Sequence, residues 1–306
     1  MSYLAALLSC ALSAGAPPLG PPRPELLARA SADETVFYFG IGSNMLRSKL
    51  ENRGLNGSTI SLLSMRPALV RGQRLAFNMR GFPPLEPGMG ALEPAPDAVC
   101  HGALCEMRRD EYEKVWLSEG GGQPNPGYEE VVVEACPYGE TGGVVVEAIA
   151  LRARTHARLA TDACPSQRYL SILIKGATEL GVQSDYVARL RALPTQRVGW
   201  FVHLLSVHHL FLVTLLFKLK CQPLVKMISK ALWMAYVPTS QASQARRFVG
   251  GAATGVLLMP SALLGALVRL VYYKAAGRPT PPMMRALMER NQQTDSTDAP
   301  QGESRD

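Results

Sequence analysis

The chain carries the stretch Val36-Phe37-Tyr38-Phe39-Gly40-Ile41-Gly42-Ser43-Asn44 near its N-terminal end. The residues up to Ile41 are β-branched or aromatic except for one glycine, which is typical of a buried strand. After the stretch, Met45, Leu46 and Leu50 recur at helical spacing. The sequence therefore predicts a strand, a tight turn and a helix in direct succession.

The composition of the predicted turn suits ligand binding. Gly42 allows backbone conformations that a side chain would block, and Ser43 or Asn44 can cap the following helix. The free N–H groups at the start of that helix then point outward and can hold a carboxylate. Since many turns of this kind are only capped connections, its role depends on the rest of the chain.

Strands and helices are also predicted beyond the turn. Further strands, recognised by their β-branched and aromatic content, cover 66–80, 98–107, 129–135 and 144–151. The Pro- and Gly-rich stretch 81–97 is predicted to be a long surface loop. Helical spacing of apolar residues covers 110–117, 166–181 and 184–193.

Glu119 stands where the predicted helix over 110–117 runs out into Gly120-Gly121-Gly122. A glutamate beside glycines is usually a solvated loop residue. The alternative is a general acid or base held in a pocket beside a glycine-rich loop. Only further motifs elsewhere in the chain can decide between these two interpretations of Glu119.

Three blocks in the chain resemble the gamma-glutamylcyclotransferase family, which has a Tyr-Gly-Ser-Asn turn after its first strand. The first is Tyr38 to Asn44, where Ile41 replaces the tyrosine of the turn. The second is Glu119-Gly120 followed by Tyr128, although Val115-Trp116 stands where the family usually has a Leu-Asp pair. The third is Pro165-Ser166-Gln167-Arg168-Tyr169, followed by Gly176-Ala177 and Gly181-Val182. Their order and distances fit the family over about half of the chain.

The resemblance implies an α+β fold, with a mixed β-barrel and flanking helices over residues 34–197. It implies an intramolecular lyase that cyclises γ-glutamyl amino acids or peptides to 5-oxoproline, with Glu119 as the general acid and base. No cofactor or metal is implied. The implied substrate-binding residues are Tyr38, Gly40, Ile41, Gly42, Ser43, Asn44, Tyr128 and Tyr169.

Two alternatives to that activity remain open at the level of sequence. One is a catalytically silent protein that binds γ-glutamyl or peptide ligands or anchors a complex at a membrane, which the departure at Ile41 favours. The other is a cyclotransferase acting on γ-glutamylamines or glutathione. Taken alone, tyrosines such as Tyr128 and Tyr169 are more often core residues with a wet hydroxyl.

The ends of the chain differ from its middle. Residues 1–33 hold a short apolar run and then a Pro-rich linker, so an organellar or secretory leader is one interpretation. Residues 198–285 are predicted to form an α-helical membrane segment, with candidate spans at 198–217 and 248–268. Residues 286–306 are polar and are predicted to be disordered.

The net charge and the cysteine spacing limit which binding partners and which cysteine chemistry the sequence predicts. The formal net charge of +7 comes without a nucleic-acid-binding motif, and basic residues flank the apolar runs, so the predicted partners are a small-molecule substrate and a membrane, not nucleic acid. The expected localisation is membrane-associated, with the compartment, the topology and the oligomeric state open. The six cysteines form no C-x-x-C pair and are predicted to be free thiols.

Overall fold

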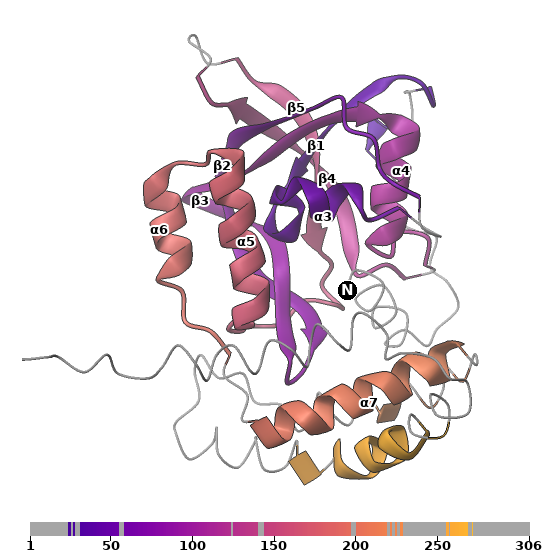
Figure 1. The fold of residues 1–306 in the computed structure, drawn as a ribbon. Helices are drawn as coiled ribbons and strands as arrows, with labels where there is room; N and C mark the ends of the chain where they lie inside the picture. The colour runs from indigo at the N-terminus through magenta and orange to yellow at the C-terminus, as the bar shows by residue number, and fades with distance from the viewer. Residues whose placement is uncertain are drawn as a thin grey trace, which may run out of the picture.

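Five strands close into a barrel in the order β1-β3-β2-β4-β5 (Figure 1). The computed structural model describes residues 24, 25, 27, 31–54, 58–123, 125–139, 144–196, 200–218, 221, 224, 227, 228, 255, 256, 258–268 and 271. The strands are β1 (Thr35–Gly40), β2 (Ser64–Phe82), β3 (Glu86–Arg108), β4 (Tyr128–Pro137) and β5 (Val146–Ala153). β1 meets β5 in parallel while its pairing with β3 is antiparallel, so the barrel is mixed, as predicted.

Helices flank this barrel, which confirms the α+β class. Figure 1 shows α5 and α6 together on one side of the barrel, α4 on another side, and α7 beyond the tip of the β2–β3 hairpin. Their bounds are α3 (Arg47–Glu51), α4 (Arg109–Ser118), α5 (Gln167–Leu180), α6 (Ser184–Arg191) and α7 (Trp200–Lys218), with a 3-10 helix over Gly42–Met45.

Alternation along β1 sends its side chains into two different hydrophobic clusters. Tyr38 packs in one of them with Tyr112 and Ile149. Phe39 and Ile41 lie in the other cluster, because successive side chains of a strand point to opposite faces. The side chain of Ile41 therefore points away from the face that carries the tyrosine.

The segment 81–97 was predicted to be a surface loop, and this prediction is wrong. β2 and β3 form one long antiparallel hairpin whose pairing continues to Phe82↔Glu86. Pro94 is accommodated because it lies beside a register shift between Arg71 and Gln73, where the ladder does not need its missing N–H. The glycine and proline content of 81–97 indicates a loop, but pairing with β2 stabilises most of this segment as part of β3.

Helix α5 begins and ends with the residues that the sequence predicted. The hydroxyl of Ser166 accepts a 3.0 Å hydrogen bond from the Tyr169 backbone N–H, which caps the helix. Gly181 ends it in the left-handed conformation at φ 78°. Midway, Gly176 faces the 3-10 turn so closely that an added Cβ would lie 2.7 Å from Leu46 N. A glycine is therefore required where α5 crosses the turn.

Substituting Gly176→Ala is expected to destabilise the protein by about 1–3 kcal/mol, because the added methyl would push α5 off the turn backbone. The free energy of unfolding from urea titration measures this effect. Lys175→Ala, at the exposed neighbouring position of the same helix, is the control and should change it by less than about 0.5 kcal/mol. Equal losses for both variants would contradict the tight crossing.

Helix α7 joins the hairpin tip to a second C-terminal helix over 258–268. The His209 ring stacks on Phe82, with ring centroids 5.5 Å apart. His209 Nδ1 also lies 2.7 Å from Ser261 Oγ, and the two helices approach so closely that a Cβ on Gly265 would lie 2.3 Å from His208 O. His209 therefore contacts both the barrel hairpin and the second helix.

The described residues cover only part of the two chain ends for which predictions were made. Among the residues with described coordinates, no helix meets the length and hydropathy needed to cross a bilayer, so the predicted membrane spans at 198–217 and 248–268 are not supported. Most of the predicted leader and linker at 1–33, and all of the predicted tail at 286–306, lie outside the described residues. Within the linker, Leu27 is fully buried in the hydrophobic cluster of Tyr38.

Lowering the pH is expected to destabilise the fold through His209, whose burial lowers its pKa from 6.5 to about 4. Because the folded state binds fewer protons, stability is full above about pH 6.5 and falls toward pH 4 by up to about 1.4 kcal/mol per unit. Urea unfolding at several pH values measures the slope, which His209→Gln should reduce between pH 6.5 and 4. An unchanged slope in this variant would rule out His209 as its source.

Candidate active site

The turn after β1 is shaped by its glycine and by Tyr169. Gly42 has φ 62°, and an added Cβ would lie 2.7 Å from the Tyr169 hydroxyl oxygen, so only glycine fits there. Ser43 and Asn44 do not cap a helix with their side chains as predicted, because the chain continues as a 3-10 helix whose N-cap position is Ile41. The side chains of Ser43 and Asn44 are therefore free to make other contacts.

Asn44 connects the turn to Tyr38 and Glu119. Its Nδ2 donates to the Tyr38 hydroxyl at 2.7 Å and to Glu119 Oε1 at 3.1 Å. This orientation of the amide is required, since the opposite one would place its oxygen against a carboxylate oxygen. The oxygen Oδ1 of Asn44 is consequently buried and has no hydrogen-bond partner within the described part of the chain.

Glu119 is held in place by the end of α4. Its backbone N–H still donates to Val115 O at 3.1 Å, and Gly120 then turns the chain with φ 91°. The side chain points inward and the residue is only 7% exposed. Glu119 is thus a buried carboxylate and not the solvated loop residue of the alternative interpretation.

Arg53 supplies the opposite charge. Its Nη1 lies 2.5 Å from Glu119 Oε1, and both side chains are nearly inaccessible, at 9% and 6% exposure. Its Nη2 donates to Ser43 Oγ at 2.8 Å. A buried charge has to be paired, because desolvation otherwise costs several kcal/mol. The guanidinium therefore fixes the carboxylate of Glu119 against the turn.

Sequence reasoning missed Arg53. The residue follows α3 and precedes Gly54, and nothing in that local sequence distinguishes it from a surface arginine at the end of a helix. The only signal was indirect, since a buried Glu119 requires a nearby cation. That this cation is Arg53 follows from the tertiary fold, which places the end of α3 beside the end of α4.

The predicted tyrosines Tyr128 and Tyr169 meet at Gly90, near the turn end of the β2–β3 hairpin. The Tyr128 hydroxyl donates to Gly90 O at 3.0 Å, and the Tyr169 hydroxyl accepts from Gly90 N at 3.0 Å. An added Cβ on Gly90 would lie 2.9 Å from the Tyr169 oxygen. Gly90 was also missed, because it lies in the segment predicted to be a loop.

Burial keeps all three tyrosines near Glu119 protonated. Desolvation first, and then the negative charge of Glu119, raise the pKa of Tyr38 and of Tyr128 well above 10. Desolvation raises the pKa of Tyr169 to about 12. These hydroxyls are therefore neutral hydrogen-bonding groups around the carboxylate.

The other two predicted residues, Gly40 and Ile41, contribute to the site through their backbone and not through a side chain. Gly40 lies between Tyr38 and Asn44, where an added Cβ would approach both side chains to 3.2 Å. Ile41 contributes its backbone to the turn, while its side chain packs with Phe39 in the second hydrophobic cluster. The replacement of a tyrosine by Ile41 thus changes the barrel packing and not the contacts of Glu119.

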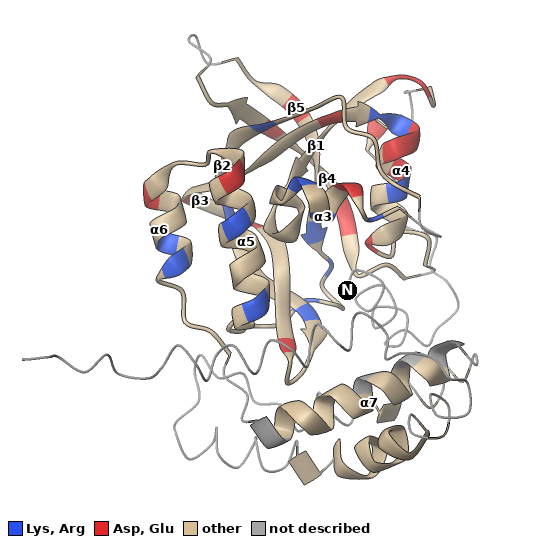
Figure 2. Cartoon of the chain, viewed as in Figure 1, with Lys and Arg blue, Asp and Glu red and all other residues tan. Residues whose placement is uncertain are grey.

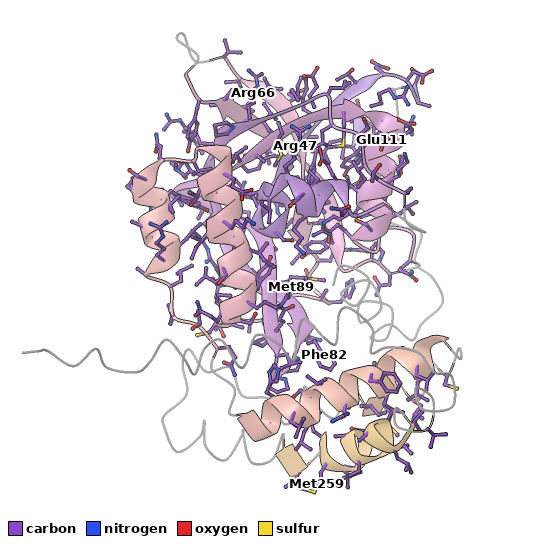
Figure 3. The ribbon with its side chains drawn as sticks, viewed as in Figure 1. Arg47, Arg66, Phe82, Met89, Glu111 and Met259 are labelled. Carbon is purple, nitrogen blue, oxygen red and sulfur yellow. The ribbon has the colours of Figure 1, made fainter. Side chains whose placement is uncertain are left out.

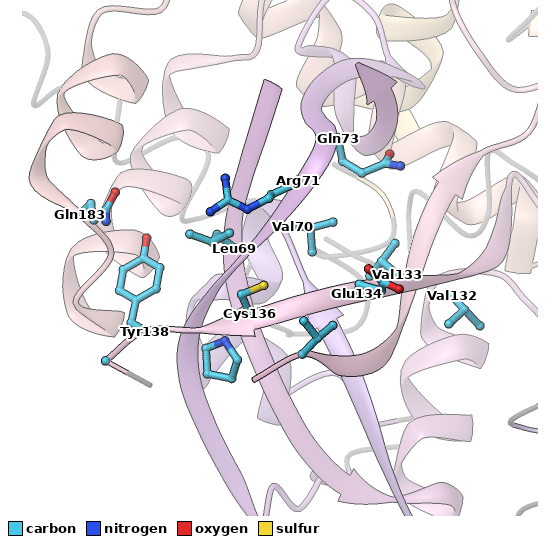
Figure 4. Close-up of a pocket in the computed structure, with 13 residues that line it drawn as sticks. Leu69, Val70, Arg71, Gln73, Val132, Val133, Glu134, Cys136, Tyr138 and Gln183 are labelled. Carbon is cyan, nitrogen blue, oxygen red and sulfur yellow. The ribbon is translucent and has the colours of Figure 1, made fainter. Parts of the chain in front are cut away.

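A separate hollow of about 750 Å³ lies between β2 and β4 (Figure 4). Its polar lining includes Arg71, Gln73, Glu134 and Tyr138, and none of the residues grouped around Glu119 takes part. The candidate active site is therefore distinct from this hollow.

Other potential chemistry is sparse in the described residues. They contain no group of three or more His, Cys, Asp or Glu side chains placed to hold a metal ion. The described cysteines are free, as predicted. Burial raises the pKa of the Cys100 and Cys105 thiols to about 12, so neither forms the thiolate that a cysteine nucleophile requires.

Fold and site together define a closed-barrel protein with a buried carboxylate centre. No family model matches the chain. It is 31% identical over 150 residues to the gamma-glutamyl cyclotransferase gliK of Claviceps purpurea, covering 46% of this chain and 65% of that protein. It is 29% identical over 181 residues to gliK of Aspergillus fumigatus, covering 51% and 63%. These matches support the gamma-glutamylcyclotransferase family, which the motifs of the chain resemble.

The chain spans slightly less than two thirds of the length of these two relatives. Among solved structures, it is similar to a gamma-glutamyl cyclotransferase at 19% identity and a TM-score of 0.44, covering 53% of this chain and 89% of the other. It is also similar to a yeast gamma-glutamyl cyclotransferase specific to glutathione, at 13% identity and a TM-score of 0.39, covering 51% and 93%. The similarity to the family is carried by the sequence matches.

Substituting Arg53→Met is expected to cost about 3–5 kcal/mol of stability, because it leaves the carboxylate of Glu119 buried without its cation. In the Glu119→Gln background the same change should cost much less. Urea unfolding of the wild type, both single variants and the double variant gives the coupling free energy. If Arg53→Met costs the same in both backgrounds, the ion pair does not stabilise the site.

Proposed function

We propose that this chain is a gamma-glutamyl cyclotransferase, which converts a γ-glutamyl amino acid or peptide into 5-oxoproline and releases the amino acid or peptide. One observation carries the proposal. Asn44 and Glu119 are buried, hydrogen-bonded neighbours with acceptor oxygens, and Asn44 Oδ1 has no partner in the described residues. Such a pair suits a substrate that brings in an ammonium group.

The chemistry requires a proton to move twice. The substrate α-ammonium, with a pKa of about 8, has to lose a proton before its nitrogen can attack. That nitrogen then bonds to the γ-carbonyl carbon, the bond from this carbon to the leaving nitrogen breaks, and the leaving nitrogen takes up a proton. A single carboxylate, Glu119, can accept the first proton and deliver the second.

The contacts of Glu119 favour one of its oxygens for this role. Arg53 and Asn44 both contact Oε1, which leaves Oε2 to face the substrate nitrogen. Because Oε1 is fixed from two directions, the carboxylate keeps its orientation while the proton moves. Arg53 is therefore a positioning residue in this proposal, and Glu119 is the catalytic residue.

Positioning of the substrate supplies the other part of the catalysis. Nucleophile and electrophile belong to one molecule, so the protein only has to hold the γ-glutamyl group in a folded conformation that closes a five-membered ring. The neutral hydroxyls of Tyr38, Tyr128 and Tyr169 surround it without adding charge. The backbone N–H groups of Gly42 and Ser43 would hold either the α-carboxylate or the oxygen of the γ-carbonyl.

The identity of the released group separates this proposal from related activities. A γ-glutamylamine or glutathione would use the same γ-glutamyl end, and so the same contacts with Asn44 and Glu119. Only the leaving side differs. We assign γ-glutamyl amino acids and γ-glutamyl peptides other than glutathione as the leading substrate class and treat γ-glutamylamines and glutathione as arms of the test.

The full chain is incubated with several γ-glutamyl amino acids, γ-glutamyl-lysine and glutathione, and 5-oxoproline is quantified. Glu119→Gln should lower its formation by roughly 10²- to 10⁴-fold, since the substitution keeps the shape but removes the group that carries the proton. Glu134→Gln, at an exposed position on β4, is the matched control and should keep wild-type activity.

Each result of this assay discriminates between the functions. Product from γ-glutamyl amino acids that depends on Glu119 supports the proposal, while product from glutathione or γ-glutamyl-lysine alone reassigns the substrate. If the wild type forms no 5-oxoproline from any of them, calorimetric binding of the same compounds tests a catalytically silent binding protein. In that case the enzymatic function is rejected.

A further inference from the structure

The helix over 258–268 uses one side to pack on α7. Leu258 and Ala262 are buried in a shared cluster with Leu205 of α7. Gly265 extends the same side, because an added Cβ would lie 2.3 Å from His208 O. Positions separated by three and four residues lie on one face of a helix. This face is therefore fully occupied by α7.

The opposite side of this helix is apolar and exposed. A helix of a globular protein normally presents polar residues to water on this side. Its exposed large apolar residues instead are Met259 (40%), Leu263 (63%), Leu264 (51%) and Leu267 (59%), and Val256 (67%) and Val271 (60%) are exposed close to its two ends. Figure 3 shows Met259 on the side of the helix pair that faces away from the barrel. A continuous apolar surface of this kind marks an interaction site.

The charges of this part of the chain have one sign. Every charged side chain between Trp200 and Met288 is a lysine or an arginine, and the sequence between α7 and the second helix contains Lys220, Lys226, Lys230, Arg246 and Arg247. Figure 2 accordingly shows no acidic residue on α7 or on its partner helix, in contrast to the barrel. An apolar helix face in a stretch of sequence whose charged residues are all cations is typical of a helix that lies at an anionic membrane surface.

We propose that the exposed side of the helix over 258–268 binds the surface of an anionic lipid bilayer, with the helix parallel to the membrane plane. Leu263, Leu267 and Val271 would enter the boundary between headgroups and acyl chains. The lysines and arginines of the same stretch of sequence would contact the anionic headgroups. α7 then lies between the bilayer and the barrel, to which it is attached through the stacking of His209 on Phe82.

A second copy of the chain is the less favourable occupant of this surface. Joining two copies through it would bring together two segments that carry positive charge and no negative charge, and like charges in contact oppose association. Anionic lipid removes that repulsion. Charge therefore favours a bilayer over a dimer, although both would cover the apolar side.

Flotation of the full chain with lipid vesicles tests the proposal. The wild type should float with vesicles of phosphatidylcholine and phosphatidylserine and much less with vesicles of phosphatidylcholine alone. Leu263→Glu/Leu267→Glu should weaken binding to the anionic vesicles by at least about a hundredfold, because two leucines lose their apolar contact. Both positions are exposed, so circular dichroism should give the same melting temperature as the wild type.

Leu63→Glu/Val132→Glu is the matched control, because it adds the same charge at exposed apolar positions of the barrel region and should float like the wild type. Failure of the wild type to float, equal binding of the Leu263/Leu267 variant, or an equal loss in the control would overturn the proposal. Analytical ultracentrifugation without lipid adds one more outcome. A wild-type dimer that the Leu263/Leu267 variant dissociates would assign the surface to a second copy.

Discussion

The buried ion pair between Arg53 and Glu119 is the constraint on which the arrangement of this barrel depends. A carboxylate that is only 7% exposed is tolerated because a guanidinium lies 2.5 Å away. That requirement connects the end of α3 to the end of α4, two segments far apart in the sequence. The same guanidinium reaches Ser43, so the turn after β1 is held by the same interaction.

A second connection runs through the hairpin of β2 and β3. The backbone C=O and N–H of Gly90 form hydrogen bonds with the hydroxyls of Tyr128 on β4 and Tyr169 on α5. Close packing around this position leaves no space for a side chain, since Gly42 and Tyr169 both approach it. Barrel strands, turn and flanking helix therefore converge on one small polar group enclosed by apolar side chains.

The C-terminal helices extend this organisation in a different way. His209 touches the hairpin tip through Phe82 and the second helix through Ser261. Their packing uses small residues such as Gly265 for close approach, while large apolar residues remain on the outside. The buried polar groups of the barrel and the exposed apolar side of this helix pair are therefore two separate features of the chain.

Local patterns in the sequence were sufficient for the strand at Thr35–Gly40, for the cap at Ser166 and for the end of α5 at Gly181, because short-range sterics and hydrogen bonds control these features. The resemblance to the family, and not any local pattern alone, grouped Tyr38, Asn44 and Glu119. The strand character of 81–97, the pairing of Arg53 and the role of Gly90 were not accessible in this way. Each depends on a partner distant in the chain, and the free energy of such contacts is set by tertiary packing and not by the local sequence.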